Sequence, residues 1–457
     1  EAERYESALI VQQLVGTLVY YSNEGQYEPR LAKKWHQDED KRWVFVLNKG
    51  LTCENNEPIT AETYRESLER TIKRIGQNGL PIFDKLIGFE DFIQERKKRI
   101  KGLISLDDKI IFNFTEAVNN GLVQMLSFSP FGYISKENLN DDGTWKNNKR
   151  FISSGAYRLK DVQLGESYLI EQNPSWKKIV DPNSPKEILF KFSLPTQIDE
   201  DGAFIVDIVG WNNKYKEKLV EYKLVPEYLS GILLGNTDNG FFSSEKNRKY
   251  LRYLVNKKKS ELDWDEKKLI PSDTFYPNQS QLHIPAPNKL EFEKLNPKHQ
   301  PLEIQGDEPI EGNSKSILWS ILKEVLEDNN ILYKFNGKSK WQDASDTSVD
   351  LRMRQVSIGG GIELWGLNIV FCSELGNKLP DPSREICELI KKADLNQLSF
   401  DEFSDLFFKR VIDDSAILPV YHSGMSLYIS NRIDLESINP TMNIIKFDHL
   451  RLKFAEP

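Results

Sequence analysis

The sequence predicts a fold of α/β or α+β layers, because the chain mixes strand patterns and helix patterns throughout, and the pattern of its second half favours α/β. Alternating bulky apolar residues, as at residues 42–50, are typical of β-strands. Apolar residues spaced three and four apart, as at residues 60–76, are typical of amphipathic helices. A strand–helix–strand pattern over residues 301–335 indicates a unit of a parallel sheet.

The first clear strand, residues 42–50, is bulky on both of its faces and ends in an Asn-Lys-Gly turn signal. We therefore expect it to be covered on both sides. Upstream, Leu31, Ala32 and Trp35 fall at helical spacing and predict a helical turn before a polar connection.

Two helices are well marked. The first, residues 60–76, has Thr60 as a candidate N-cap, Glu62 in its first turn and Gly76 as a stop signal. The second covers residues 244–255 and carries basic side chains. Further strands are predicted at residues 110–114, 155–162, 167–173 and 203–209, and the middle two form a hairpin.

The pattern of the second half of the chain predicts an α/β topology with a parallel sheet. Its elements are a strand at 301–305, a helix at 314–330, strands at 331–335 and 348–354, and a helix at 383–395. Ser399 and Glu402 then form a capping-box pattern. The helix that they open is expected to bury Phe403, Leu406, Phe407 and Val411, and extended structure follows over residues 417–430.

Bulk composition excludes two classes of protein. The formal net charge is -8, from 61 basic and 69 acidic residues, which argues against a general nucleic-acid binder. Basic runs at 96–99 and 257–259 are interpreted as solvated helix faces. The sequence has no run of 18 apolar residues, so no membrane-spanning helix is expected.

The chain has three cysteines, which do not form a disulfide scaffold. Cys372 and Cys387 could form a bridge in an oxidising compartment, and the sequence leaves this open. Position 1 is Glu, with no export signal after it, so a signal is expected either never to have existed or to have been removed.

Searches for catalytic and metal-binding motifs find none. The sequence lacks P-loop, dinucleotide-binding, zinc-protease and nucleophile-elbow patterns. The glycines at 359–361 lack the context of a phosphate loop, and no two of the five histidines share metal-ligand spacing. We therefore predict no catalytic residue, no cofactor and no metal.

Four blocks of sequence carry a family resemblance. In residues 18–70 the matching positions are Gly25, Pro29, Leu31, Ala32, Trp35, Phe45, Gly50, Pro58, Thr60, Ala61 and Glu62. The other blocks are 154–178 (Gly155, Tyr157, Asn173, Pro174, Trp176), 234–258 (Asn236, Phe242, Arg248, Leu254) and 411–433 (Asp414, Pro419, Tyr421). Together, and in this order, they resemble the family 5 extracellular solute-binding proteins, the oligopeptide-, dipeptide- and nickel-binding components of ABC importers.

The resemblance implies a two-lobed, periplasmic-binding-protein-like fold of type II with an extra subdomain in the N-terminal lobe. Lobe 1 is expected at residues 1–232 plus 419–457, with the subdomain at about 36–150, and lobe 2 at residues 233–418. Two segments would cross between the lobes, Pro419 would stiffen one crossing, and the lobes would close around a ligand by hinge motion.

The resemblance also implies which residues line the ligand site: Gly16, Thr17, Leu18, Ser357, Ile358, Gly359, Gly360, Glu363, Trp365, Tyr421 and His422. Gly16 and Thr17 are either backbone contacts or plain strand residues, and Trp365 is either a core or a ligand residue. Glu363 is either a solvated acid or the partner of a cation. Tyr421 is favoured for the cleft, because a phenol offers both a face and a hydroxyl, whereas a structural role is favoured for His422.

Two departures from the family pattern bear on the ligand. The first strand has Gly16-Thr17-Leu18 where the family has Glu-Gly-Leu. In peptide binders of the family, a loop aspartate pairs with the amino terminus of the peptide. The only acid in the equivalent loop here is Glu363.

The resemblance implies a periplasmic or extracellular receptor that captures a peptide or other small polar ligand for an ABC importer. Its partners would be that ligand and the permease, and it would act as a monomer without nucleic acid and without enzymatic activity. The alternative is a sensory or protein-interaction module of the same fold with a degenerate pocket.

Overall fold

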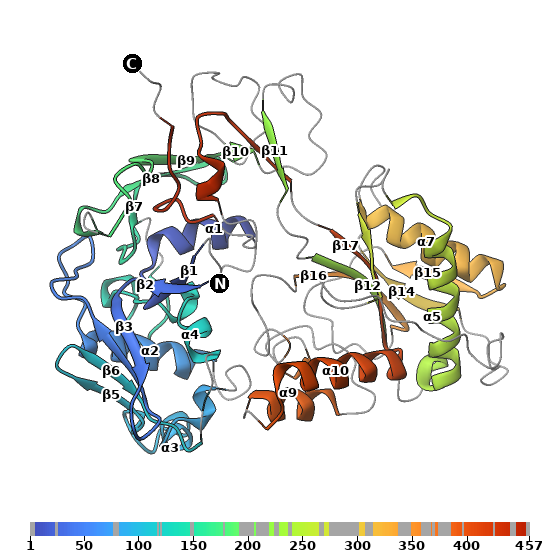
Figure 1. The fold of residues 1–457 in the computed structure, drawn as a ribbon, viewed down its shortest axis with the longest axis horizontal. Helices are drawn as coiled ribbons and strands as arrows, with labels where there is room; N and C mark the ends of the chain where they lie inside the picture. The colour runs from blue at the N-terminus through green and yellow to red at the C-terminus, as the bar shows by residue number, and fades with distance from the viewer. Residues whose placement is uncertain are drawn as a thin grey trace. The chain divides into compact units, whose positions relative to one another are not determined.

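The computed structural model divides into two compact units. The first comprises Glu1–Ile208, Asn212–Leu224 and Ser426–Pro457, and the second comprises Val209–Trp211 and Val225–Met425 (Figure 1). The residues that the structure describes are 5–22, 26–75, 82–116, 118, 121–146, 150–176, 179–191, 205–206, 219–223, 228–235, 240–264, 269–273, 301–306, 314–336, 349–357, 367, 371–372, 385–394, 397–423, 426–438 and 445–453.

The first unit contains a four-stranded antiparallel sheet. In spatial order its strands are β3 (Ala32–Gln37), β4 (Trp43–Leu47), β6 (Lys109–Phe112) and β5 (Leu103–Leu106). All five positions of β4 are buried, which confirms that this strand is covered on both faces. The Phe45 ring lies 6.3 Å from the Trp35 ring and 6.3 Å from the Trp43 ring, so both tryptophans pack against Phe45.

The helical turn predicted around Trp35 is wrong. Residues Ala32 to Gln37 form β3 and pair with β4, with a register shift between Ala32 and Lys34. Leu31 and Ala32 are buried although they do not form a helical turn. Pairing with β4 satisfies the main-chain hydrogen bonds of this segment.

The helix predicted at residues 60–76 is confirmed as α2 (Ala61–Ile75), which contacts β5 and β6. Thr60 Oγ1 accepts a hydrogen bond from Thr63 N at 3.2 Å, the N-cap interaction expected from the sequence. Tyr64, Leu68 and Ile72 are fully buried along one face. The proposed stop, Gly76, lies outside the described residues.

Smaller elements complete the first unit. The helices are α1 (Tyr5–Leu14), α3 (Phe89–Ile93) and α4 (Gly121–Met125), and β1 (Val19–Tyr21) pairs with β2 (Tyr27–Pro29). One three-stranded sheet has the order β7 (Tyr157–Gln163), β8 (Ser167–Gln172), β9 (Glu187–Lys191). A second three-stranded sheet has the order β10 (Ile205–Val206), β18 (Ser426–Ile429), β11 (Val220–Lys223). The β7–β8 pair confirms the predicted hairpin, and Gly165 takes a φ of 81° in its turn. Short 3-10 helices lie at Phe83–Lys85, Ser129–Phe131, Lys136–Asn138, Pro174–Trp176, Phe241–Ser243 and Leu435–Ser437.

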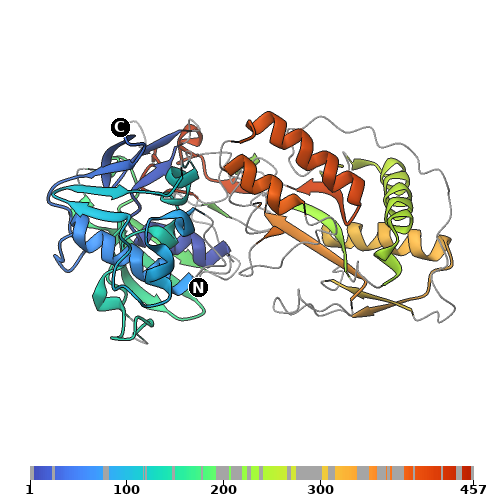
Figure 2. The same ribbon diagram turned by 90° about the horizontal axis from the view of Figure 1, so that it is seen from below.

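The second unit is a three-layer α/β/α arrangement. Its sheet has the order β13 (Ile270–Pro271), β17 (Ile417–Ser423), β12 (Tyr228–Leu234), β16 (Leu351–Ser357), β14 (Leu302–Gln305) and β15 (Tyr333–Asn336). Helices α5 (Glu245–Ser260) and α7 (Ser314–Asp328) cover one face, and α9 (Ile386–Asp394) and α10 (Phe400–Asp414) cover the other (Figures 1 and 2). Side chains of β12 alternate between the two cores: Ile232 and Leu234 pack with α5 and α7, whereas Leu229 and Leu233 pack with α9 and α10.

The prediction of a parallel sheet is correct only for β14, which runs parallel to β15 and β16. The other described pairs of this sheet are antiparallel. The crossover helix α7 requires parallel β14 and β15, whereas β12 and β17 carry the chain into and out of the unit in opposite directions. The lobe boundaries expected at 232/233 and 418/419 fall inside β12 and β17, respectively.

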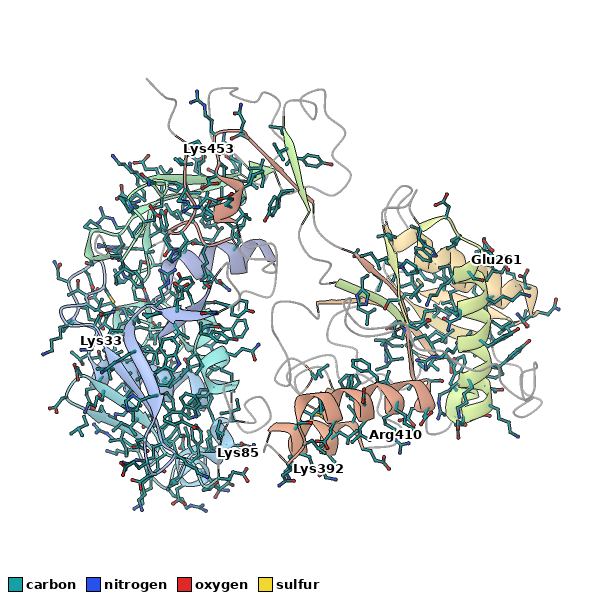
Figure 3. The ribbon with its side chains drawn as sticks, in the orientation of Figure 1. Lys33, Lys85, Glu261, Lys392, Arg410 and Lys453 are labelled. Carbon is teal, nitrogen blue, oxygen red and sulfur yellow. A yellow bond between two sulfur atoms is a disulfide. The ribbon has the colours of Figure 1, made fainter. Side chains whose placement is uncertain are left out.

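Helix α10 has the predicted capping box, with both Ser399 and Glu402 interactions present. Phe403 and Phe407 are buried as expected, but Leu406 is 43% exposed, so its predicted burial is wrong. The buried face of α10 is formed by Phe403, Phe407 and Val411, which are spaced four residues apart, together with Phe408. Leu406 lies outside this face. Arg410, labelled on α10 in Figure 3, pairs with Glu385 at 2.5 Å, which ties α10 to the start of α9.

Cys372 and Cys387 form a disulfide, a pairing that the sequence left open.

Candidate functional site

Gly16, Thr17 and Leu18 were predicted to lie on the first strand, but they directly precede β1, which begins at Val19 in the first unit. Gly16 N donates to Ser154 Oγ at 3.0 Å, and Gly16 O accepts from Tyr133 N at 2.8 Å. A Cβ atom on Gly16 would lie 2.6 Å from Ser154 O, so the close approach of two main chains requires glycine here.

Thr17 and Leu18 also make their contacts within the first unit. The Thr17 hydroxyl donates to Val19 O at 2.8 Å, and Thr17 O accepts from Leu31 N at 3.1 Å. Leu18 is fully buried. The structure therefore places Gly16, Thr17 and Leu18 together in a buried segment that is held by hydrogen bonds within the first unit.

The first unit also contains a buried ion pair that the sequence did not reveal. Arg30 Nη1 contacts Asp448 Oδ2, and their side chains are 5% and 0% exposed. The Arg30 guanidinium also lies 5.0 Å from the centre of the Tyr20 ring and 5.2 Å from that of Trp176, within the range of cation–π attraction. The pair links Arg30, which directly follows β2, to the C-terminal segment of the same unit.

The electrostatics of this cluster favour the ionised pair. Burial opposes the charge on Asp448, but Arg30, aided by His449, outweighs burial and holds the pKa of Asp448 below its usual value. Burial lowers the pKa of His449, although Asp448 pulls in the opposite direction. The His449 ring stacks on Tyr20 with 4.3 Å between ring centres.

In the second unit, three strand ends converge. Tyr228, the first residue of β12, is in register with Ser357 at the end of β16 and with Ser423 at the end of β17. Strand pairing therefore brings the candidates Ser357 and His422 to the same end of the sheet. The loop that follows β16 carries the remaining candidates of this unit, which lie outside the described residues: Ile358, Gly359, Gly360, Glu363 and Trp365.

Tyr421 lies in the core of the second unit and is fully buried. Its ring is 5.9 Å from the Trp264 ring. A register shift in the β12–β17 pairing turns Val420 and Tyr421, two adjacent residues, toward the same core. This local irregularity, which sequence alternation does not show, accounts for the position of Tyr421.

His422 is also fully buried. It pairs across the sheet with Leu229 of β12 and Ile270 of β13. The structural role favoured for His422 from the sequence stays a prediction.

At two places in the sequence, a strand of one unit is followed closely by a strand of the other. β11 ends at Lys223 and β12 begins at Tyr228, and β17 ends at Ser423 and β18 begins at Ser426. The strands that flank them are paired in both units, with Lys223 opposite Ser426 in the first and Tyr228 opposite Ser423 in the second.

Among the described residues, no three or more His, Cys, Asp or Glu side chains gather in a way that could hold a metal ion. Within the same part of the chain, every helix is too short or too polar to cross a membrane.

Comparisons with known proteins now add to this geometry. Residues 26–298 match a family model described as bacterial extracellular solute-binding proteins, family 5 Middle. A putative binding protein of Haemophilus influenzae is 22% identical over 281 residues, covering 61% of this chain and 50% of that protein. The probable deoxycholate-binding periplasmic protein YgiS of Escherichia coli is 34% identical over 183 residues, 39% of this chain and 34% of that protein. The chain thus matches half or less of the length of these relatives.

Solved structures show the same fold over nearly the whole chain. A periplasmic oligopeptide-binding protein of an oligopeptide ABC transporter from Borrelia burgdorferi superposes with a TM-score of 0.74 at 16% identity. The superposition covers 99% of this chain and 96% of that one. At this level of identity the likeness concerns the fold, and it confirms the predicted two-lobed architecture.

Proposed function

This chain belongs to the bacterial extracellular solute-binding proteins of family 5, and from that premise we propose that it captures a peptide or another small polar solute between its two units. The protein works in the periplasm or outside the cell membrane and presents the solute to the permease of an ABC importer. Capture requires no covalent chemistry, so the protein acts as a receptor and not as an enzyme.

The observation that carries this proposal is the family match together with the division of the chain. Residues 26–298 fit the model of the family 5 solute-binding proteins, and the chain divides into two compact units. Small-molecule sites enclose most of the surface of their ligand, which excludes water from it.

The proposed solute contacts differ between the two units. The main-chain groups of Gly16 and Thr17 described above already form hydrogen bonds inside the first unit, so we assign no direct solute contact to these groups. Direct contacts are assigned to the loop that begins at Ser357. In that loop Glu363 offers a carboxylate for a cationic group, and Trp365 offers an apolar face.

The names of the similar proteins suggest two solute chemistries to test. One is named for oligopeptides and the other for deoxycholate. Peptides present main-chain donors and acceptors, whereas a bile acid presents a rigid apolar body and one carboxylate. A carboxylate at Glu363 favours the cationic amino group of a peptide over the anionic bile acid.

A thermal-shift screen tests the proposal. The panel contains di- to pentapeptides, N-acetylated versions of the same peptides, bile acids and sugars. A solute at a hundred times its Kd stabilises the native protein by about 2.7 kcal/mol, which raises the Tm by several degrees. We expect free peptides to produce this rise.

Variants of the loop then locate the site. Trp365→Ala and Glu363→Gln are expected to weaken the best hit at least tenfold, as loss of one good contact does. Trp145→Ala is the matched control, because it removes an indole that is 38% exposed in the first unit. A panel without any hit, or equal losses in Trp145→Ala and Trp365→Ala, would contradict the proposal.

A further inference from the structure

A run of basic residues at 96–101 stands out in a chain whose formal net charge is -8. The run lies in the loop between α3, which ends at Ile93, and β5, which begins at Leu103. Its exposed cations are Arg96, Lys97, Lys98, Arg99 and Lys101. The loop therefore places a local positive charge on the surface of the first unit.

Hydrogen bonds of its main chain hold this loop in place. Lys97 N donates to Asp91 O of α3 at 3.0 Å. Ile100 is buried, and its N–H group donates to Glu69 Oε1 of α2 at 2.8 Å. The cations are thus carried by a backbone that is fixed to two helices. A fixed backbone loses little further freedom when a partner binds, which favours binding.

Neighbouring acids neutralise only part of the charge of the loop. Arg96 Nη2 lies 2.7 Å from Asp91 Oδ1, and Arg99 Nη2 lies 3.2 Å from Glu62 Oε1. Three cations of the loop have no carboxylate of the described residues within 4 Å: Lys97, Lys98 and Lys101. We call these three residues the lysine patch. Five consecutive residues span at most about 14 Å, so the three charges are close together.

The side chains of the loop distinguish between classes of anionic partner. Single-stranded nucleic acids stack their bases on aromatic side chains, and protein partners bury apolar or aromatic anchors. From Gln94 to Lys101 the only apolar side chain is that of Ile100, which is 1% exposed. An anionic lipid surface needs no such anchor, because it attracts basic segments by charge alone.

We propose that the lysine patch binds the phosphate groups of an anionic lipid surface and so docks the first unit reversibly on a membrane. The protein works in the periplasm or outside the cell membrane, where such a surface is within reach. Because the whole chain is acidic, the same surface repels most of the molecule, and the patch determines which face turns toward the lipid. Docking needs no bound solute, so it is independent of the proposed function.

The expected strength follows from the number of lysines. Each lysine near an anionic membrane strengthens the attraction about fivefold, so three lysines together contribute roughly a hundredfold. The net negative charge of the chain offsets part of this gain. The attraction reaches about 10 Å at 0.1 M salt, so binding should depend strongly on ionic strength.

Co-sedimentation of the full chain with vesicles is the first measurement. One set of vesicles contains phosphatidylglycerol and phosphatidylcholine, and the other contains phosphatidylcholine alone. We expect the wild type to bind only the first set, and to be released in about 1 M salt, where the Debye length is about 3 Å. Equal binding to both sets, no binding to either, or binding that persists in high salt would overturn the proposal.

A triple variant locates the binding surface. Lys97→Gln, Lys98→Gln and Lys101→Gln together should weaken binding to the phosphatidylglycerol vesicles at least tenfold. All three side chains are exposed, so the variant should keep the Tm of the wild type. If the triple variant does not fold, the double variant Lys97→Gln with Lys98→Gln replaces it, with an expected loss of at least fivefold.

The matched control removes the same number of charges from the same unit. It combines Lys34→Gln, Lys41→Gln and Lys49→Gln, which change exposed lysines spread over the β3–β4 hairpin. This control should bind nearly as tightly as the wild type. An equal loss in both triple variants would show that only net charge matters and would overturn the proposal.

A soluble polyanion tests the competing partner. If polyglutamate binds the wild type and the phosphatidylglycerol vesicles do not, the patch serves an acidic protein segment and the lipid proposal is overturned. None of these measurements uses a solute, so a failed solute screen and a failed docking test are distinguishable.

Discussion

Replacing Asp448 with Asn tests whether the buried ion pair supports the first unit. The change leaves the Arg30 guanidinium, whose side chain is 5% exposed, packed against Tyr20 and Trp176 without its counter-charge. Removing one partner of a buried pair costs about 3–5 kcal/mol. For a domain of this class each kcal/mol lowers the Tm by about 2–4 °C, so we expect the transition of the first unit to fall by roughly 6–20 °C.

Scanning calorimetry at neutral pH measures this shift. The control is Asp91→Asn, which removes a carboxylate that pairs with Arg96 at the surface, where the two side chains are 47% and 55% exposed. A surface pair contributes about 0–1 kcal/mol, so the control should move the Tm by no more than a few degrees.

The pH dependence of the same variant gives an independent check. Because the pKa of Asp448 is lowered in the folded protein, the pair adds stability above the unfolded value of 3.8, and this stability is lost as the pH falls through the folded pKa. The difference in stability between wild type and Asp448→Asn should therefore shrink in strong acid, as the pH falls through the folded pKa of Asp448. A Tm of Asp448→Asn within one degree of the wild type would refute the reasoning.

Three further predictions concern other features of the fold. Gly16→Ala places a Cβ atom 2.6 Å from Ser154 O, so the urea midpoint should fall by the equivalent of about 1–3 kcal/mol; an unchanged midpoint would contradict the close approach. Burial lowers the pKa of His449 below 6.5 in the folded protein, so the unfolded chain binds a proton at a higher pH than the folded protein does. The wild type should therefore lose stability as the pH falls through about 6.5, and His449→Gln should lose less. Measuring the Tm of both proteins against pH checks this. Replacing Cys372 and Cys387 with Ser opens a loop of 15 residues and should cost about 3 kcal/mol, and a reducing agent should lower the Tm of the wild type but not of this variant.

Much of the fold could be predicted from local signals. The cap at Thr60, the spacing of Tyr64 and Leu68 and the capping box at Ser399 are short-range patterns, and each is found where the sequence indicates it. The four sequence blocks likewise indicated the family that the model match confirms. Such signals act within one turn or one strand and need no knowledge of the remaining chain.

The errors arose where distant parts of the chain decide the outcome. Trp35 fits a helical turn by spacing, but pairing with β4 makes it part of a strand. Tyr421 was expected to face the cleft, and the irregularity beside Pro419 turns its ring into the core. Arg30 and Asp448 lie at opposite ends of the sequence, so neither residue indicates its partner. The predicted roles of Glu363 and Trp365 remain predictions, because both lie outside the described residues.

Small-angle X-ray scattering with and without a solute from the screen tests the closing of the two units most directly. If the units bend toward each other around their guest, the radius of gyration should fall when a solute that raises the Tm is added at saturation. The fall should reverse when the solute is dialysed away. A solute that binds tightly and leaves the radius of gyration unchanged would contradict capture by closure.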